Sequence, residues 1–338
     1  MKTIVTTISC LLIYTATFAQ SDSSQIFFQK GVDEISARRY QAASMYLDKA
    51  TQENPRYEQA YLQNAYANLA MNKSFAAKEL FNKVYDLDPN NTDAINNLMQ
   101  IYYDYRDFDK AREFALKSKT DKADRIIAMI YYQQEDYGNA ITALGKVVAK
   151  NPNDAEANYD IARSYLEMEQ DAQAIPFYRK AVEADPSKNL WAYELGLIYY
   201  NMDDYANAVD MMTKASANGY PHSNDFDENL GFAYIFSGKG EMGEKLLGGV
   251  MAKKPGDKQL VRDIADAFYK AKMYDRALDY CQKLMEQDKK DAKALYQAGM
   301  CFQKKGQKDR GQQMCDAAID MDPSLAGLRQ KQMMDTGL

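Results

Sequence analysis

Apolar residues recur at intervals of three or four along most of the chain, in pairs of short segments separated by polar turns. In residues 155–188, two such segments flank the polar turn at 169–171. The apolar positions are Ile161, Ala162 and Tyr165 in the first segment and Ala174, Tyr178 and Ala181 in the second. This spacing is typical of amphipathic helices, so the pattern predicts a series of helical hairpins.

Prolines mark the boundaries between these helix pairs at a regular interval. Pro55 and Pro89 are 34 residues apart, and so are Pro152 and Pro186. Proline cannot continue a helix but often stands at its boundary, so each of these residues predicts the end of one pair and the start of the next. The predicted units begin near residues 24, 58, 92, 121, 155, 189, 224, 258 and 292.

One position early in each second helix is always a small residue. Its occupants are Ala43, Ala77, Ala111, Ala140, Ala174, Ala208, Gly243, Ala277 and Gly311. A small side chain lets two helices approach closely while larger neighbours fill the space around them. We therefore expect this position to lie at the crossing of the two helices in each unit.

The unit that begins at residue 189 resembles the tetratricopeptide repeat family. The residues that carry the resemblance are Trp191, Leu195, Gly196, Tyr199, Tyr205, Ala208 and Ala215. Nine units in register extend it over almost the whole chain after the first 19 residues. The resemblance implies an all-α fold, a right-handed α-solenoid of about nine helix-turn-helix repeats.

Departures from the repeat suggest how the solenoid is divided. The unit at residue 92 is short and ends without proline, and the unit at residue 224 is rich in glycine. Since each glycine in a helix costs up to about 1 kcal/mol relative to alanine, we expect the softest part of the solenoid between residues 216 and 250. We accordingly predict repeats 1–6 over residues 20–223, repeats 7–9 over 224–325, and a C-terminal cap over 326–338.

The first 19 residues have the pattern of a secretory signal peptide. Lys2 precedes a mostly apolar run, and the small residues Thr17 and Ala19 come just before the polar Gln20. We expect cleavage after Ala19 and export to the periplasm. A lipid-modified Cys10 and a retained anchor are the alternatives. No later apolar run approaches the ~18 residues of a membrane span, so none is expected in the mature chain.

Composition limits the chemistry that the chain is able to perform. The 338 residues are 46% hydrophobic and 27% charged, which is typical of a globular protein, and the net charge of −6 argues against nucleic-acid binding. A single histidine excludes a His-rich metal site, and we predict neither metal nor cofactor. Cys281, Cys301 and Cys315 are expected to pack in the core, and a Cys301–Cys315 bridge stays open.

Two patterns resemble catalytic or nucleotide-binding motifs. Residues 238–243 read Gly-Lys-Gly-Glu-Met-Gly, but this fingerprint works only between a strand and a helix, and here it falls between two helices. His222 stands beside Ser223 and Asp225, yet neighbours in a loop do not form a triad by adjacency, and an exposed loop histidine is expected. We therefore predict that the chain is not an enzyme.

The resemblance also implies where a partner would bind. In the tetratricopeptide repeat family the first helices line a concave groove, and the corresponding positions of this chain are rich in tyrosine; they also include Gln100 and Met129. The predicted partner-binding residues are Tyr66, Tyr103, Arg125, Tyr132, Tyr159, Arg163, Tyr193, Tyr200, Phe232, Tyr269 and Tyr296. Tyrosine is enriched at binding surfaces, although some of these residues are also expected to pack between repeats. Arg125 and Arg163, in adjacent repeats, are candidates to hold a partner carboxylate.

These expectations lead to two functional hypotheses. The first is a non-enzymatic scaffold of the cell envelope that binds a protein or peptide partner in the groove. The alternative is an accessory protein that binds glycan or peptidoglycan, because aromatic faces also stack on sugar rings.

Overall fold

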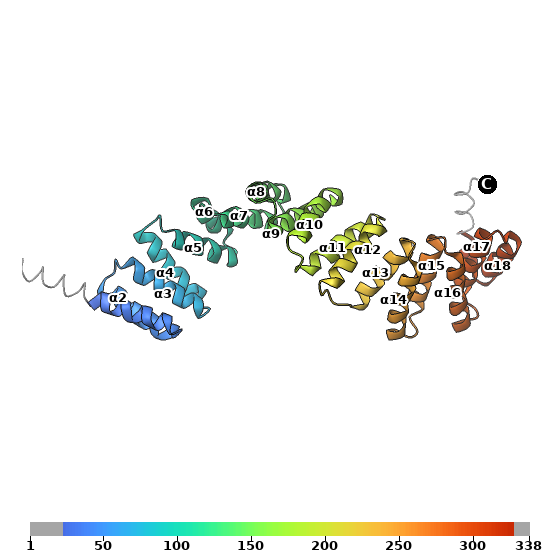
Figure 1. The fold of residues 1–338 in the computed structure, drawn as a ribbon, viewed down its shortest axis with the longest axis horizontal. Helices are drawn as coiled ribbons and strands as arrows, with labels where there is room; N and C mark the ends of the chain where they lie inside the picture. The colour runs from blue at the N-terminus through green and yellow to red at the C-terminus, as the bar shows by residue number, and fades with distance from the viewer. Residues whose placement is uncertain (1–22, 328–338) are drawn as a thin grey trace, which may run out of the picture. The chain divides into compact units, whose positions relative to one another are not determined.

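The computed structural model describes residues 23–327, and within that range it contains helices and no strand (Figure 1). The all-α fold of tandem helical repeats expected from the sequence is thereby confirmed. The backbone contacts divide the chain into two compact units, Met1–Gln170 and Asp171–Leu338. This division does not test the predicted boundary between repeats 6 and 7, which stays a prediction. The predicted signal peptide at residues 1–19 lies outside the described residues.

Unit 1 contains four complete helical pairs and the first helix of a fifth. Its first described helix covers residues 23–36. The others are α2 (Tyr40–Glu53), α3 (Glu58–Ala70), α4 (Ser74–Leu87), α5 (Thr92–Asp104), α6 (Phe108–Lys117), α7 (Asp121–Gln133), α8 (Tyr137–Lys150) and α9 (Ala155–Glu167).

Unit 2 begins with a second helix and continues with four pairs. Its helices are α10 (Asp171–Ala184), α11 (Asn189–Asn201), α12 (Tyr205–Ala217), α13 (Asn224–Phe236), α14 (Gly240–Lys253), α15 (Lys258–Lys270), α16 (Tyr274–Gln287), α17 (Ala292–Lys304) and α18 (Lys308–Met321), followed by the short 3₁₀ helix η1 (Pro323–Leu325). Every predicted repeat start from residue 58 onward coincides with the first residue of a helix, which confirms the repeat register.

Each turn between a first and a second helix passes through a left-handed residue at the same position of the repeat. These residues are Arg38, Asn72, Arg106, Glu135, Glu169, Asp203, Gly238, Lys272 and Gly306. A left-handed residue is a common way to end a helix, because it turns the chain away while its amide bonds a free carbonyl. The hairpins are therefore closed by one recurring local geometry.

The small residue of each second helix lies at the helix crossing, as the sequence predicts. All seven alanines at this position are fully buried. At Gly243 and Gly311 a Cβ atom would lie 2.5 Å from a carbonyl oxygen of the preceding helix, that of Gly231 or Gly299. Neighbouring pairs share one core, which runs from α3 to α7 in unit 1 and from α13 to α17 in unit 2.

The irregular repeats also have the form that the sequence suggests. The second helix α6 has only 10 residues, whereas the other second helices have 13 or 14. A longer turn, residues 218–223, joins α12 to α13. At the end of unit 2, Leu325 is buried against the last pair.

Candidate partner-binding face

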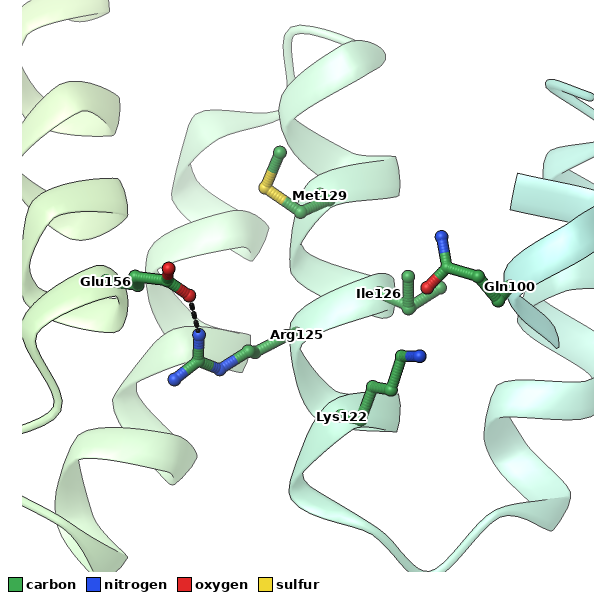
Figure 2. A pocket seen from close by; sticks show the side chains of 6 residues that line it. All are labelled: Gln100, Lys122, Arg125, Ile126, Met129 and Glu156. Carbon is green, nitrogen blue, oxygen red and sulfur yellow. Dashed lines mark hydrogen bonds and ion pairs between the residues drawn. The ribbon is translucent and has the colours of Figure 1, made fainter. Parts of the chain in front are cut away.

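A pocket of about 430 Å³ opens on the first helices of three consecutive repeats in unit 1 (Figure 2). It is lined by Gln100 from α5, by Lys122, Arg125, Ile126 and Met129 from α7, and by Glu156 from α9. Every lining residue comes from a first helix, so the pocket lies on the face for which the sequence predicts a groove. We call this surface the first-helix face of unit 1.

The four residues of α7 reach the pocket because of helical periodicity. Side chains three or four positions apart lie on the same side of a helix, and Lys122, Ile126 and Met129 have that spacing. Ile126 is 6% exposed and forms an apolar floor, whereas Met129 is half-buried and Lys122 is exposed. The pocket therefore combines an apolar base with a charged rim.

Arg125 is held by carboxylates of the following repeat. Its guanidinium forms ion pairs with Asp154 and with Glu156, the latter at 2.7 Å (Figure 2). Asp154 also caps α9 by accepting a hydrogen bond from the amide of Ala157 at 3.0 Å. Arg125 thus connects two repeats, and its charge is already balanced within the chain.

The same connection recurs at the equivalent position in unit 2. Arg262 lies 2.8 Å from Asp291, and Asp291 caps α17 through the amide of Ala294. In both cases the arginine stands 29 residues before the aspartate. The recurrence identifies the arginine as a part of the contact between repeats.

Three predicted residues meet in a second polar network on the first-helix face. Arg163 donates to the hydroxyls of Tyr159 at 3.3 Å and Tyr132 at 3.5 Å, and to Glu167 at 3.4 Å. The Tyr132 hydroxyl donates to Glu167 at 2.9 Å. Burial and this hydrogen bond raise the pKa of Tyr132 to about 12, so it stays protonated at neutral pH. Like Arg125, Arg163 already interacts with an internal carboxylate.

Asp160 is an additional ionisable group that the sequence reasoning missed. It is half-buried on α9. Burial raises the pKa of its carboxyl to about 6, while the positive charges of Arg125 and Arg163 oppose that shift. The sequence did carry a signal for this group, because Asp160 is an acidic residue between Tyr159 and Arg163, which are two predicted groove positions.

The remaining predicted tyrosines of unit 1 are half-buried between neighbouring helices. Tyr66 packs edge-on against Phe81 at 5.5 Å, and its hydroxyl accepts a hydrogen bond from Asn97 at 3.4 Å. Tyr103 packs against Phe108 at 6.0 Å. Both contribute to the contacts between helices as well as to the surface.

The predicted residues of unit 2 show a similar mixture of packing and exposure. Tyr193 contacts Tyr220 and Phe226, with ring centroids 4.6 and 5.2 Å away, and Tyr200 packs against Tyr205 and Phe236. Phe232 and Tyr269 are half-buried against the core, and burial raises the pKa of Tyr269 to about 12. Tyr296, by contrast, is only 3% exposed and lies in the C-terminal cluster. Its side chain offers a partner almost no surface.

The glycines that resemble a nucleotide-binding motif have structural roles. Gly238 is the left-handed residue of its turn, with φ of 85°. Gly240 begins α14 against Phe268 and Met273, and Gly243 lies at the crossing with α13. The motif therefore runs from the turn after α13 into the first turn of α14, so it follows a helix rather than a strand.

Cysteines and acidic residues form no metal site in the described part of the chain. Cys281, Cys301 and Cys315 are buried and form no disulfide, and burial raises the pKa of Cys281 and Cys301 to about 12. Between residues 23 and 327 no group of three His, Cys, Asp or Glu side chains is placed to hold a metal ion. None of the described helices has the length and apolar character of a membrane span.

Comparisons with known proteins identify the repeat. Two family models, both described as tetratricopeptide repeat, match residues 127–189 and residues 192–216 and 292–325. A search of curated proteins gave no match. Proteins built from this repeat are generally scaffolds for protein–protein interaction and are typically non-enzymatic.

Solved structures of tetratricopeptide repeat proteins align with the chain. One is YrrB, "a TPR protein with an unusual peptide-binding site", which is 26% identical over 56% of this chain and 98% of YrrB, with a TM-score of 0.39. MamA is 25% identical over 49% of this chain and 97% of its own, with a TM-score of 0.38. The P58(IPK) TPR domain is 17% identical over 93% of this chain and 99% of its own, with a TM-score of 0.31. The family-model matches and the repeated helix pairs support a protein built from tetratricopeptide repeats.

Proposed function

We propose that this chain is an exported, non-enzymatic scaffold that binds an extended segment of a partner protein on the first-helix face of unit 1. The observation that carries the proposal is the pocket formed by α5, α7 and α9. Stacked repeats present such continuous surfaces to extended ligands, and a pocket that spans three repeats reads several residues of a peptide at once.

The chemistry of the pocket favours an apolar side chain of the partner. Ile126 and Met129 provide the apolar base, and methionine adapts its shape to different ligands. Arg125 and Arg163 are already engaged by Asp154, Glu156 and Glu167. A partner carboxylate would have to compete with these internal groups, so we propose that the arginines position the helices and that the apolar base supplies most of the affinity.

Peptide selection on the purified chain tests this proposal. Peptides enriched from a random library are measured by fluorescence anisotropy against the wild type, Met129→Glu and Met45→Glu. Met45 is an exposed methionine on α2, a second helix, and serves as the matched control. Loss of one buried apolar contact of about 1.5–3 kcal/mol predicts a roughly 10- to 150-fold weaker Kd for Met129→Glu. Equal affinity of both variants, or no enriched peptide, contradicts the proposal.

The glycan hypothesis receives no support from the arrangement of the aromatic rings. Sugar stacking needs an open ring face, but Tyr132 packs against Tyr137 at 5.3 Å and Tyr200 against Tyr205 at 5.4 Å. Tyr193 lies against two further rings, Tyr220 and Phe226. These contacts leave less aromatic surface for a sugar than the sequence suggests.

The proposal of export and of a role in the cell envelope depends on the sequence of residues 1–19 alone. Cell fractionation followed by N-terminal sequencing tests it. A mature chain that begins at Gln20 in the periplasmic fraction supports export, whereas a chain that retains Met1 in the cytoplasm contradicts it.

A further inference from the structure

Three polar residues of unit 2 form a hydrogen-bonded chain outside the first-helix face of unit 1. The Ser216 hydroxyl lies 2.7 Å from Nε2 of His222, and Nδ1 of the same imidazole lies 2.6 Å from Oδ1 of Asp227. Ser216 stands near the end of α12, His222 in the turn 218–223, and Asp227 in the first turn of α13. The sequence pairs His222 with Ser223 and Asp225, whereas the fold gives it different partners.

The environment of Asp227 determines which nitrogen of His222 carries the proton. Asp227 is 7% exposed, and Nζ of Lys253 lies 3.8 Å from its other oxygen. Carboxylate oxygens only accept hydrogen bonds, so we assign the tautomer in which Nδ1 of His222 donates to Asp227. In the neutral imidazole Nε2 then carries the lone pair, and the Ser216 hydroxyl donates to it.

Ser216 differs from the other hydroxyls at the ends of these helices. Thr213, on the same helix, bonds the carbonyl of Val209 at 2.7 Å, and Ser237 bonds that of Tyr234 at 3.0 Å. Bonding to the helix backbone is the ordinary arrangement for such side chains. The Ser216 hydroxyl instead faces an imidazole whose side chain is 48% exposed, which leaves the pair open to a molecule from solution.

We infer that Ser216, His222 and Asp227 form a nucleophilic centre that accepts the acyl group of a carboxylic ester. A serine, an imidazole and a buried carboxylate in this order are the arrangement that activates serine nucleophiles, whatever the fold. Oγ of Ser216 attacks the ester carbonyl while Nε2 of His222 takes the hydroxyl proton. The carbon–oxygen bond of the ester breaks, and the alcohol leaves with the proton that His222 returns to it, which leaves an acyl-serine.

The backbone hydrogen bonds near Ser216 predict that acylation at this centre is slow. The amides of Asn218, Gly219 and Tyr220 already donate to the carbonyls of Lys214, Ser216 and Ala215. They are not available to stabilise the negative oxygen of the tetrahedral intermediate, a contribution of roughly 10²–10³ in rate at established serine nucleophiles. General-base assistance alone contributes about 10²–10⁴. We therefore expect one acyl group per chain rather than rapid turnover.

Covalent labelling of the full chain tests the inference. The protein is incubated with p-nitrophenyl acetate or a fluorophosphonate, and the modified residue is located by peptide mass spectrometry. We expect the label on Ser216, no label in Ser216→Ala, and at least a tenfold slower reaction in His222→Gln. The His222 ring packs on Phe226 at 4.9 Å as well as bonding Asp227, so circular dichroism checks that this variant keeps its fold.

Ser187 provides the internal control. Its hydroxyl donates to Asp185 at 2.6 Å without an imidazole between them, so it has a carboxylate partner but no base of the same kind. The inference is overturned if Ser187 is labelled as fast as Ser216, if the acyl group is found on His222 instead, or if His222→Gln reacts at the wild-type rate.

Discussion

Substitution of Gly243 by alanine tests the close crossing of α13 and α14. A Cβ at this position would lie 2.5 Å from the carbonyl oxygen of Gly231 and 2.7 Å from Cγ1 of Ile235. Both distances are well below ordinary van der Waals contact. Because the nearest atom belongs to the backbone, relief requires that the two helices move apart.

Gly248 provides a matched control in the same helix. It is exposed, and a Cβ there would meet no atom within 4 Å. Both substitutions gain up to about 1 kcal/mol of helix propensity, but Gly243→Ala also carries an overpacking cost of about 1–3 kcal/mol. We expect Gly248→Ala to be more stable than the wild type, and Gly243→Ala to be less stable than Gly248→Ala by that overpacking cost.

Urea unfolding measures the free-energy difference, and hydrogen exchange of peptides from α13 and α14 locates it. Local exchange is needed because repeat proteins unfold in segments rather than in a single step. Equal stability of Gly243→Ala and Gly248→Ala, within about 0.5 kcal/mol, would refute the close crossing as a determinant of stability.

Three further predictions concern charge and local stability. Burial raises the pKa of Asp160 to about 6, so ionisation of this carboxyl opposes folding above that pH. Asp160→Asn should therefore raise the free energy of unfolding by up to about 3 kcal/mol near pH 7.5 and leave it unchanged below the ordinary pKa of 3.8. An equal gain at both pH values in urea titrations contradicts this prediction. Although burial acts in the opposite direction, the hydrogen bonds from Arg262 and from the amide of Ala294 hold the pKa of Asp291 below 3.8. Arg262→Met should therefore reduce the free energy of unfolding at neutral pH, and this difference from wild type should disappear as the pH falls through the folded pKa of Asp291. A loss of stability that persists in acid argues against the ion pair. Amides in residues 216–250, where glycine is frequent, should exchange faster than those of the flanking repeats, and slower exchange there disproves the predicted soft segment.

The helical hairpins and their register were predictable because the relevant information is local. A proline at the same position closes six of the nine predicted units, a small residue at the helix crossing recurs in all nine, and each repeat packs mainly on its neighbours. The left-handed turn position was not predictable in the same way. Arg38, Glu135 and Lys272 occupy it although they do not favour that conformation, because the packing of the two helices imposes it.

The candidate site was predictable only in part. Gln100, Arg125 and Met129 fall at groove positions expected from the repeat, and they do line the pocket. Lys122, Ile126 and Glu156 were missed. Lys122 and Glu156 reach the pocket from the first turns of α7 and α9, and only the stacking of three repeats brings these residues together.

The sequence by itself determined the class of fold and the starts of the repeats from residue 58 onward. The tertiary structure decided which charges neutralise one another: Arg125 finds Asp154 and Glu156, and His222 finds Ser216 and Asp227. The physical reason is that helical periodicity is a property of consecutive residues, whereas hydrogen bonds and ion pairs depend on distances of a few ångströms between side chains of different helices. Those distances are set by packing, which the order of residues does not reveal.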